Sequence, residues 1–428
     1  MPQILDTTAQ LVNHPALHNV VFDVKNMYGA KGDGTTDDTA AIQAAITATG
    51  WPTTPGTVLF PGGPSASYKI TSAINIDGGG ASSTPELHLI SDGATLKTTT
   101  AGINMLNITN SIVSTTRVKV RGLYFNINAA ATGVLLNNAE LCEFTDCGFG
   151  GSYSTGVKIT GTSTSNKFTG CEFANMARGI WLNGQAQYLG IVNCSFVEQL
   201  IGSPLNWIES DNGGNPADNV TIVGNSFRGT GATLPLIEIL YGQHWTIAGN
   251  QFTNAEKESI WIGNDGSSRG HAITGNTFTL GKRHDIYING GRENTIVGNV
   301  FGIRAGGVTS NTFADVRIAN TFGGAAGSDN IVVGNRSLDT AAAITYVVEA
   351  DAGCVNLIVQ GNTGLAGFSA AGIYDGFYGT TPIAKPAAYT VTNPTTDRGL
   401  NVTADTLAQS LQVLGTLIAD LQSLGLIG

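Results

Sequence analysis

A short phrase of alternating apolar and polar positions recurs along the middle of the chain. Each copy runs from an apolar, usually β-branched residue through a small residue and an Asn or Cys to a Phe. Successive copies lie 21 to 31 residues apart and end at Phe149, Phe173, Phe196, Phe227, Phe252, Phe278 and Phe301, with a shorter echo at Phe322. A period of this length is typical of a solenoid, in which each repeat is one coil that stacks on its neighbours.

The repeat predicts an all-β fold, a right-handed parallel β-helix with the Phe residues stacked inside its coils. The Asn residues of the phrase are expected to stack at a turn, with side-chain amides bonded along the column: Asn225, Asn250, Asn276, Asn299 and Asn320. Cys147, Cys171 and Cys194 hold the same position in earlier coils, and we interpret them as a buried column of small side chains. Looser copies around Asn335 and Asn362 lack the Phe.

The two ends of the chain differ from the repeat, and four segments are therefore expected. They are a tail over residues 1–20, the β-helix over 21–375, a linker with short strands over 376–402, and a C-terminal helix over 403–428.

Each terminal region contains one predicted helix. A helix over Asp37–Thr49, capped by Asp37 or Asp38, is expected to close the open N-terminal coil. In the C-terminal helix the apolar residues follow the 4-3-4-3 spacing of a coiled-coil seam, at Leu407, Leu411, Leu414, Ile418 and Leu421. This spacing favours a homotrimer, and the alternative is a helix that folds back onto its own solenoid.

A second short strand follows most copies of the phrase, and its outward positions carry large side chains. Aligned on their aliphatic residues, these strands place one residue per coil in a single outer column: Trp181, Trp207, Glu238, Trp261 and Tyr287. An exposed apolar stripe indicates a binding surface, and sugar rings have apolar faces that stack on Trp and Tyr. We therefore expect the four aromatic residues to bind a polysaccharide, unless loops or a neighbouring subunit cover them.

Glu238 lies between aromatic residues in this column and is the first candidate for catalysis. Hydrolysis of a glycosidic bond commonly uses two carboxyl groups, one to protonate the leaving oxygen and one to act as nucleophile or base. Glu209 is expected one coil earlier, with Cα atoms roughly 8 Å apart. Asp211 and Asp265 are alternative partners. Aromatic neighbours would raise the pKa of one carboxyl group, as an acid catalyst requires.

Composition and charge exclude several classes of partner. The formal net charge of -10 argues against nucleic acid and against an anionic membrane surface. No apolar run approaches the roughly 18 residues that span a bilayer, so no membrane insertion is expected, and the N-terminus lacks the pattern of a signal peptide. The chain has 5 Cys, an odd count, and no Cys or His spacing that suits zinc. We expect no disulfide framework, no metal and no cofactor.

The start of the chain resembles a known family. Val21–Ile46 includes Tyr-Gly-Ala-Lys-Gly-Asp-Gly-Thr-Thr-Asp-Asp-Thr-Ala-Ala-Ile, and Gly56–Gly63 reads Gly-Thr-Val-Leu-Phe-Pro-Gly-Gly, followed by Tyr68–Ile70. These residues resemble the opening of the pectate-lyase-like superfamily, which includes polygalacturonase-type enzymes and many bacteriophage tailspikes. The resemblance implies a right-handed β-helix that binds or cleaves carbohydrate. Phage proteins of this shape are usually trimers that recognise a host surface glycan.

The family motifs are only partly present. Asp33, Asp37 and Asp38 belong to the opening motif, and we interpret them as turn and cap residues. Of the four catalytic motifs of polygalacturonases, partial counterparts exist only at 264–266 (Asn-Asp-Gly) and 269–272 (Arg-Gly-His-Ala). This departure argues against a simple pectin hydrolase.

The sequence as a whole favours a tailspike-like protein, in the virion or otherwise extracellular, that binds and hydrolyses a bacterial surface polysaccharide. A non-catalytic adhesin or structural tail protein is the alternative. A lyase acting on an acidic glycan is a further one. For the lyase, His271 and Arg269 are candidate substrate-binding residues, within a group of basic residues that also contains His244, Lys257, Lys282, Arg283, His284 and Arg292.

Overall fold

The computed structural model describes residues 20–374, apart from 81–82, 128–130, 152–153, 198–205, 212–215, 230–233, 264–267, 306–311, 321–326, 340–345, 352, 365–366 and 371–372. The expected N-terminal tail up to residue 19, the linker and the C-terminal helix lie outside the described residues.

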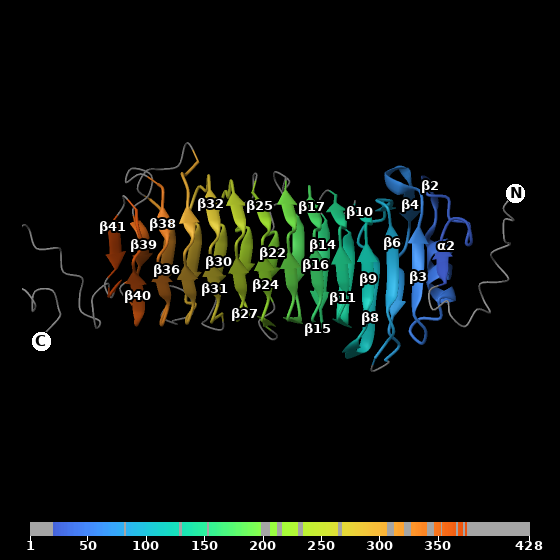
Figure 1. The fold of residues 1–428 in the computed structure, drawn as a ribbon, viewed down its shortest axis with the longest axis horizontal. Coiled ribbons are helices and arrows are strands. Elements are labelled where there is room, and N and C mark those ends of the chain that lie inside the picture. The colour runs from blue at the N-terminus through green and yellow to red at the C-terminus, as the bar shows by residue number, and fades with distance from the viewer. Residues whose placement is uncertain are drawn as a thin grey trace, which may run out of the picture.

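The described chain is a parallel β-solenoid in which successive coils stack along one axis (Figure 1). The described strands form three sheets, here called A, B and C, with 14, 12 and 16 strands. Each coil adds one strand to a sheet before the chain moves to the next sheet. The expected mostly-β solenoid with a short helix near its N-terminal end is therefore confirmed.

The strands are short, and sheets A and B follow the chain in simple order. Sheet A contains β1 Val21–Asp23, β3 Gly56–Phe60, β6 Leu87–Ser91, β9 Val118–Arg121, β12 Glu143–Thr145, β16 Lys167–Thr169, β20 Gly190–Val192, β24 Thr221–Val223, β28 Thr246–Ala248, β31 Ala272–Thr274, β34 Thr295–Val297, β37 Ile331–Val333, β40 Leu357–Gln360 and β42 Ile373–Tyr374. Sheet B contains β2 Asp33–Asp37, β4 Ser67–Ile70, β7 Thr95–Thr98, β10 Tyr124–Ile127, β13 Gly148–Gly150, β17 Glu172–Ala174, β21 Ser195–Val197, β25 Ser226–Arg228, β29 Gln251–Thr253, β32 Thr277–Thr279, β35 Val300–Phe301 and β38 Arg336–Ser337.

Sheet C has a main row of strands and a second row beside it. The main row contains β5 Ile74–Asp77, β8 Asn104–Thr115, β11 Thr132–Glu140, β14 Thr155–Thr160, β18 Arg178–Leu182, β22 Ile208–Ser210, β26 Ile237–Ile239, β30 Ile260–Gly263, β33 Ile286–Asn289, β36 Val316–Ala319, β39 Tyr346–Ala350 and β41 Gly367–Ala370. The second row, on the side where the chain turns into sheet A, contains β15 Thr162–Thr164, β19 Gln185–Gln187, β23 Ala217–Asp218 and β27 Gly242–Gln243.

The helix α2 (Thr39–Ala48) packs against β1, β3 and β5 at the N-terminal end. Its buried residues are Ile42, Ala45 and Ile46, which shield the apolar interior of the first coils. The Asp38 carboxylate makes no cap bond to the helix, because it accepts hydrogen bonds from the backbone N–H groups of Lys31 and Gly32 at 2.6 and 3.0 Å. Asp38 is therefore a turn residue and not a cap, whereas Asp37 Oδ1 accepts from the Thr39 backbone N–H at 3.1 Å and Asp33 Oδ1 from those of Thr35 and Thr36.

The Phe residues of the repeat form a continuous stack inside sheet B. From Phe125 to Phe301, rings on neighbouring coils have centroids 4.6 to 5.2 Å apart and planes within 22° of parallel. This separation follows from the strand spacing of a sheet, about 4.8 Å. The buried rings therefore join the coils into one core, as expected.

The Asn residues form a buried ladder at the turn between sheets A and B. The Asn250 backbone N–H and side-chain amide both donate to Asn276 Oδ1, at 2.9 and 3.0 Å, and Asn250 Nδ2 also donates to the Ile222 carbonyl. The same pattern repeats at Asn225, Asn276, Asn299 and Asn335. Each amide thereby satisfies backbone groups that the turn would otherwise leave buried and unpaired.

One expected member of the ladder is wrong. Asn299 bonds to Asn335 rather than Asn320, and Phe301 is in register with Ser337. Asn320 lies after β36, and its backbone N–H donates to Asp351 Oδ2. The coil that follows Phe301 is longer than the others, so the echo at 322 is not the next repeat. The expected interpretation of the cysteines is confirmed: Cys147, Cys171 and Cys194 are buried and free, and each thiol points to a carbonyl of the previous coil.

Candidate functional site

The outward positions of sheet C bring two carboxylates together between aromatic residues. In the backbone register, one position per coil forms a column along neighbouring strands: Lys158, Trp181, Glu209, Glu238, Trp261 and Tyr287. Neighbouring members have Cα atoms about 4.8 Å apart, since parallel strands have that spacing. The pair Glu209 and Glu238 therefore stands between Trp181 on one side and Trp261 on the other.

The expected place of Trp207 in this column is wrong. Trp207 is fully buried, its ring lies 5.8 Å from the ring of Phe196, and its Nε1 donates to the Arg228 carbonyl. Ile208 pairs with Ile180, so Glu209 takes the outer position that had been given to Trp207. Trp207 is thus a core residue with no access to a sugar. The correction brings Glu209 into direct register with Glu238.

The two glutamates are buried, but they have different partners. Glu209 Oε2 forms an ion pair with Arg178 Nε at 2.7 Å, with both side chains about 10% exposed. Burial raises the pKa of Glu209, and the charge of Arg178 opposes that rise. Burial also raises the pKa of Glu238, to about 7, and the neighbouring charge of Glu209 adds to this effect. Near neutral pH, Glu238 can therefore carry a proton beside an ion-paired Glu209.

Asp211 organises the Trp181 end of the site. Its Oδ1 accepts hydrogen bonds from Trp181 Nε1 at 2.9 Å and Asn183 Nδ2 at 3.0 Å. The indole of Trp181 also contacts two cations, because Lys158 Nζ and the Arg178 guanidinium lie 4.1 and 4.2 Å from its ring centroid. Trp181 thus holds Arg178, the cation that pairs with Glu209, besides any contact it makes with a ligand.

The aromatic residues on the other side form a second group. The rings of Trp261 and Tyr287 are nearly parallel, with centroids 6.3 Å apart, and His284 continues the group 5.6 Å from Tyr287. The Trp261 indole leans over Gly263, where an added Cβ would lie 3.1 Å from Nε1. The absence of a side chain at Gly263 therefore gives the indole its place beside Glu238.

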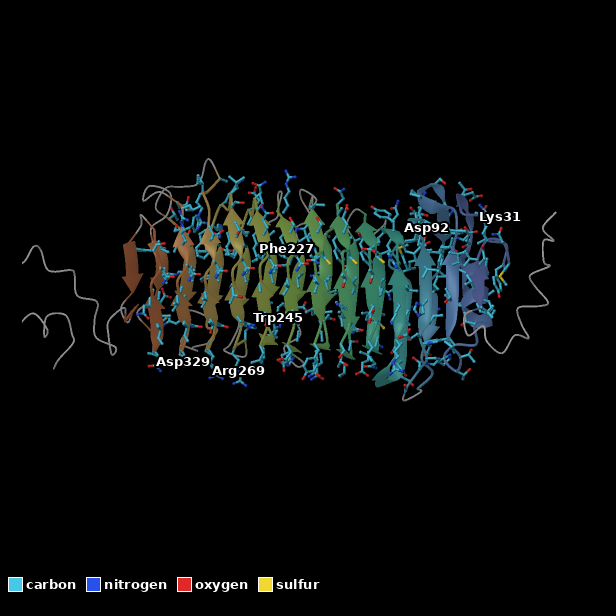
Figure 2. All side chains as sticks on the ribbon, viewed as in Figure 1. Lys31, Asp92, Phe227, Trp245, Arg269 and Asp329 are labelled. Carbon is cyan, nitrogen blue, oxygen red and sulfur yellow. The ribbon has the colours of Figure 1, made fainter. Side chains whose placement is uncertain are left out.

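Three other predicted site residues lie elsewhere or outside the described residues. His271 is buried and lies in a second ladder at the turn into sheet A, where its Nδ1 accepts from the Trp245 backbone N–H and its Nε2 faces Ser268 Oγ at 3.0 Å. Burial lowers the pKa of His271 to about 3, so it is a neutral structural residue and the expectation of sugar contact is wrong. Arg269 is half-buried and bridges to Gln243 beside β27, at the edge of the solenoid seen in Figure 2. Asp265 lies outside the described residues.

The basic residues expected to attract an acidic glycan do not gather at the two glutamates. His244 pairs with Asp218 at 3.0 Å, Lys282 with Glu256 at 2.7 Å, and Arg283 lies 3.9 Å from Glu258. His284 is half-buried, its surroundings lower its pKa to about 4, and it hydrogen-bonds to Ala314. The cations at the Trp181 end of the column are instead Lys158 and Arg178, while Arg317 follows Tyr287 in register at the other end and pairs with Glu349 and Asp351.

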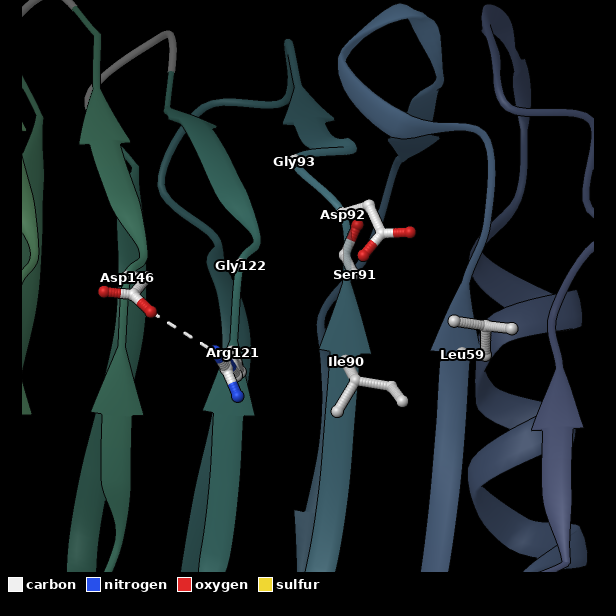
Figure 3. Close-up of a pocket in the computed structure, with 8 residues that line it drawn as sticks. All are labelled: Leu59, Ile90, Ser91, Asp92, Gly93, Arg121, Gly122 and Asp146. Carbon is white, nitrogen blue, oxygen red and sulfur yellow. Dashed lines mark ion pairs between the residues drawn. The ribbon is translucent and has the colours of Figure 1, made fainter.

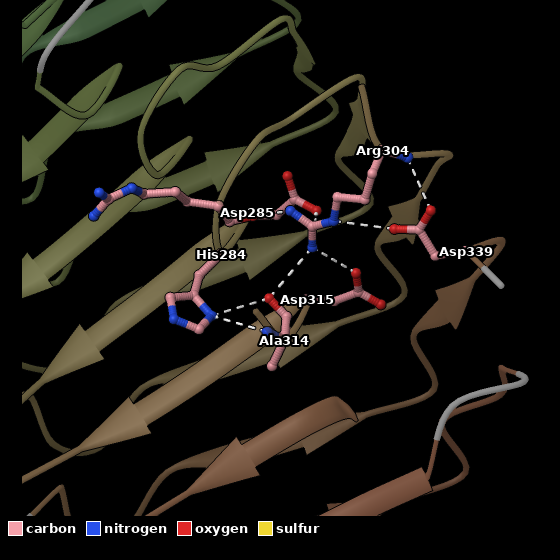
Figure 4. A network of polar contacts seen from close by, with 7 residues as sticks. His284, Asp285, Arg304, Ala314, Asp315 and Asp339 are labelled. Atoms are coloured by element: carbon pink, nitrogen blue, oxygen red, sulfur yellow. Dashed lines mark hydrogen bonds and ion pairs between the residues drawn. The ribbon is translucent and has the colours of Figure 1, made fainter. Parts of the chain in front are cut away.

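Two other polar regions contain no comparable pair of carboxylates beside aromatic residues. An open hollow of about 630 Å³ lies over sheet A, where the exposed side chains of Arg121 and Asp146 approach to 3.7 Å (Figure 3). Nearer the C-terminal end, Arg304 is buried among Asp285, Asp315 and Asp339 and forms ion pairs with all three at 2.8 to 3.1 Å (Figure 4). Among the described residues, no group of His, Cys, Asp and Glu has the arrangement of a metal site.

Sequence reasoning missed Arg178, Lys158 and Asn206 as members of the site, the last as a hydrogen-bond partner of the Glu238 side chain. Lys158 could have been found by extending the alignment one coil toward the N-terminus, because Val157 and Ile159 alternate with it as Ile180 and Leu182 do with Trp181. Arg178 and Asn206 gave no such signal, since they stand where the chain enters its strand.

Comparisons with known proteins agree with this architecture. Residues 21–263, more than half of the 428 residues, match a family described as rhamnogalacturonase A/epimerase, pectate lyase-like. A search of curated proteins gave no match. Within the described residues, no helix is long and apolar enough to cross a membrane.

Several solved structures share the fold. The A-module of the mannuronan C-5 epimerase AlgE4 of Azotobacter vinelandii has a TM-score of 0.63 at 12% identity, over 82% of this chain and 98% of that one. The Dettilon tailspike protein has a TM-score of 0.59 at 18% identity, over 81% and 68%. The surface adhesin PfbA of Streptococcus pneumoniae has a TM-score of 0.56 at 16% identity, over 86% and 97%. The chain spans 57% of the length of a Geobacillus virus E2 protein, ORF18, at 18% identity and a TM-score of 0.49.

Proposed function

Because this chain belongs to the rhamnogalacturonase A/epimerase family of pectate-lyase-like proteins, we propose that it binds a bacterial surface polysaccharide on sheet C and hydrolyses it. One observation supports the proposal above all others. Glu209 and Glu238 stand in register on neighbouring strands, between Trp181 and Trp261. Enzymes that hydrolyse a glycosidic bond usually do so with a pair of carboxyl groups, and here the pair lies beside aromatic residues.

The two glutamates have different roles in this proposal. Glu238, whose pKa burial raises to about 7, protonates the glycosidic oxygen as the sugar leaves. Glu209, held by Arg178, carries the negative charge and attacks or activates water. Trp261 and Tyr287 contact the apolar faces of the sugars, while Asp211 holds Trp181 in place. Neighbouring strands hold the two Cα atoms about 4.8 Å apart, so the flexible side chains can bring the carboxyl groups to the roughly 5 to 5.5 Å of a retaining pair.

The experiment is a set of matched Glu→Gln variants assayed on a panel of purified capsule and cell-wall glycans, with products analysed by mass spectrometry. Glu238→Gln and Glu209→Gln each remove a role in the reaction, so each is expected to lower kcat by about 100-fold or more. Glu172→Gln is the control, because Glu172 is an exposed residue of β17 on sheet B. Unchanged turnover in both site variants would refute hydrolysis at this pair.

Binding without cleavage is the second candidate, and the site contains one observation in its favour. Glu209 and Asp211 are already engaged by Arg178, Trp181 and Asn183, which suits a rigid binding surface as well as a reactive one. A glycan that binds with no product, in wild type and in both Gln variants alike, would establish the adhesin. Unsaturated sugars among the products would establish a lyase instead.

The proposal includes a setting. A glycan-cleaving solenoid of this kind fits a phage tail or another extracellular location, and the Leu-rich spacing over residues 403–428 fits a homotrimer.

A further inference from the structure

The outer face of sheet A changes character along the solenoid. In its N-terminal strands the outward positions include Lys119, Arg121, Glu143 and Lys167. From β20 to β40 every outward residue is uncharged, and all except the final Gln360 are Gly, Ala, Thr, Val or Ile. These outward residues of β20, β24, β28, β31, β34, β37 and β40 are called the uncharged face below. They are half-buried or exposed, so they form part of the accessible surface of the chain.

The uncharged face is continuous with a turn that also lacks charge. Where the chain leaves sheet A, the coils carry glycines with φ between +61° and +68° at 224, 249, 275, 298, 334 and 361. An added Cβ at Gly249, Gly275 or Gly298 would meet nothing within 4 Å, so this edge is open. Beyond it, the first outward residues of sheet B are Ser195, Ser226, Gln251, Thr277 and Val300, all without charge, and the column ends at the exposed Arg336. A chain with a net charge of -10 thus keeps one long side neutral apart from Arg336 at its C-terminal end.

The size and chemistry of this side fit a protein surface better than a sugar or a nucleic acid. Seven strands at about 4.8 Å span about 29 Å along the axis, and sheet A with the turn and the first outward column of sheet B is on the order of 20 Å wide, which gives roughly 600 Å². A stable interface needs about 800 Å² per partner, so the side supplies most of one. It lacks the aromatic and charged side chains that hold sugars in the column of sheet C. Its single cation, Arg336, argues against a phosphate backbone as occupant, because such binding needs several cations.

We propose that the uncharged face is where a second copy of this chain packs, with the two solenoids side by side. The argument is one of charge: two chains of net charge -10 repel each other, and the repulsion is least where both present neutral, flat strands. Parallel sheets are ordinarily packed against other structure on both faces. The accessible stretch of Thr, Val and Ala on sheet A is therefore expected to pack against a partner. The proposal is independent of whether the glutamates of sheet C are catalytic.

The test compares two double variants that add the same charge to the same two coils. Thr246→Lys with Thr274→Lys alters the uncharged face, whereas Thr253→Lys with Thr279→Lys alters half-buried threonines in the second outward column of sheet B. The mass of the full chain, 44.2 kDa per copy, is measured by light scattering at micromolar concentrations. Wild type and the sheet B variant are expected to be oligomers, and the sheet A variant a monomer, with Kd raised about 100-fold or more.

Circular dichroism and thermal melting of the monomeric variant show whether it remains folded. Two results overturn the proposal: a wild-type monomer, or a sheet A variant that stays assembled. A wild-type monomer whose melting temperature falls only in the sheet A variant means that a segment of the same chain covers the face. An oligomer that survives the lysines is held together elsewhere, for example through residues 403–428.

Discussion

Glu238 is a carboxyl group that the fold holds away from water. Its residue is only 6% exposed, the neighbouring Glu209 is negatively charged, and its nearest compensating cation, Arg178, is already ion-paired with Glu209. The same features that would make Glu238 an acid catalyst therefore make its ionised form unfavourable. Two consequences of this conflict are measurable.

The first is a pH dependence of turnover. Because burial raises the pKa of Glu238 to about 7, kcat/KM on a cleaved glycan is expected to fall tenfold per pH unit above pH 7, as the acid loses its proton. A profile measured from pH 5 to pH 9 checks this. An alkaline limb far from neutrality, or one that persists unchanged in Glu238→Gln, would show that another group supplies the proton.

The second is a pH dependence of stability. The folded protein holds the Glu238 proton to higher pH than the unfolded chain does, so this stability is complete below about pH 4.5 and is lost as pH rises through about 7. The shift corresponds to about 3 kcal/mol. Glu238→Gln keeps the neutral form at every pH and is therefore expected to melt higher than wild type at pH 8 and about equally at pH 4.5. Equal melting temperatures at pH 8 would contradict the burial argument.

At the scale of the element, the Asn ladder connects each coil to the next. Replacing Asn250 by Ala removes its side-chain amide bonds to Asn276 Oδ1 and the Ile222 carbonyl, and it leaves the Asn225 N–H without an acceptor. The expected cost in free energy of unfolding is about 3 kcal/mol, since more than one buried group loses its partner. Gln251→Ala on the exposed face of β29 is the matched control, and thermal melting of both variants measures the difference. A loss no larger than in the control would mean that water replaces the amide.

The elements that could be predicted from the sequence are those whose residue type is dictated by position. Phe fills the interior of sheet B and Asn pairs with turn backbone on almost every coil, so both repeat visibly. The coil with Trp207 breaks the rule. There the second inward position is Ser210, where neighbouring coils have Leu182 and Ile239, so aliphatic residues alone could not fix the alignment. An alignment shifted by two residues keeps the same residues facing inward and outward, so the alternation of sides cannot reveal the shift.

The site was predictable in kind but not in detail. An outward stripe of aromatic and acidic residues follows from strand alternation, and Trp181, Glu238, Trp261 and Tyr287 do share one column. Trp207 directly precedes Ile208, the first inward residue of its strand. The chain bends as it enters this strand, so the indole of Trp207 lies in the core as well. The partners of Glu209 could not be inferred, since Arg178 reaches it from an earlier coil across a distance that sequence spacing does not encode.

At the scale of the whole molecule, the C-terminal coils contain a buried charge imbalance. One guanidinium, Arg304, faces Asp285, Asp315 and Asp339, and burial raises the pKa of all three carboxyl groups although Arg304 opposes this. Folded-state pKa values above the unfolded ones mean that stability is lost as pH rises toward neutrality. Arg304→Leu leaves the carboxyl groups without a cation. The variant is expected to lose about 4 kcal/mol in free energy of unfolding at pH 8, and its melting temperature is expected to fall more at pH 8 than at pH 5. Equal losses at both pH values would show that packing, not charge, is the role of Arg304.

The stacked coils of the solenoid also determine how such a disturbance spreads. Strands of one sheet pair only with the strand before and the strand after, so a loosened coil is felt by its immediate neighbours and little beyond. At high pH, the coils around Arg304 are therefore expected to unfold first, from the C-terminal end, while the coils that hold Glu209 and Glu238 remain folded. The effect of a destabilising change therefore depends on its position along the solenoid, and a weakened coil shortens the folded part of the solenoid before the whole molecule unfolds.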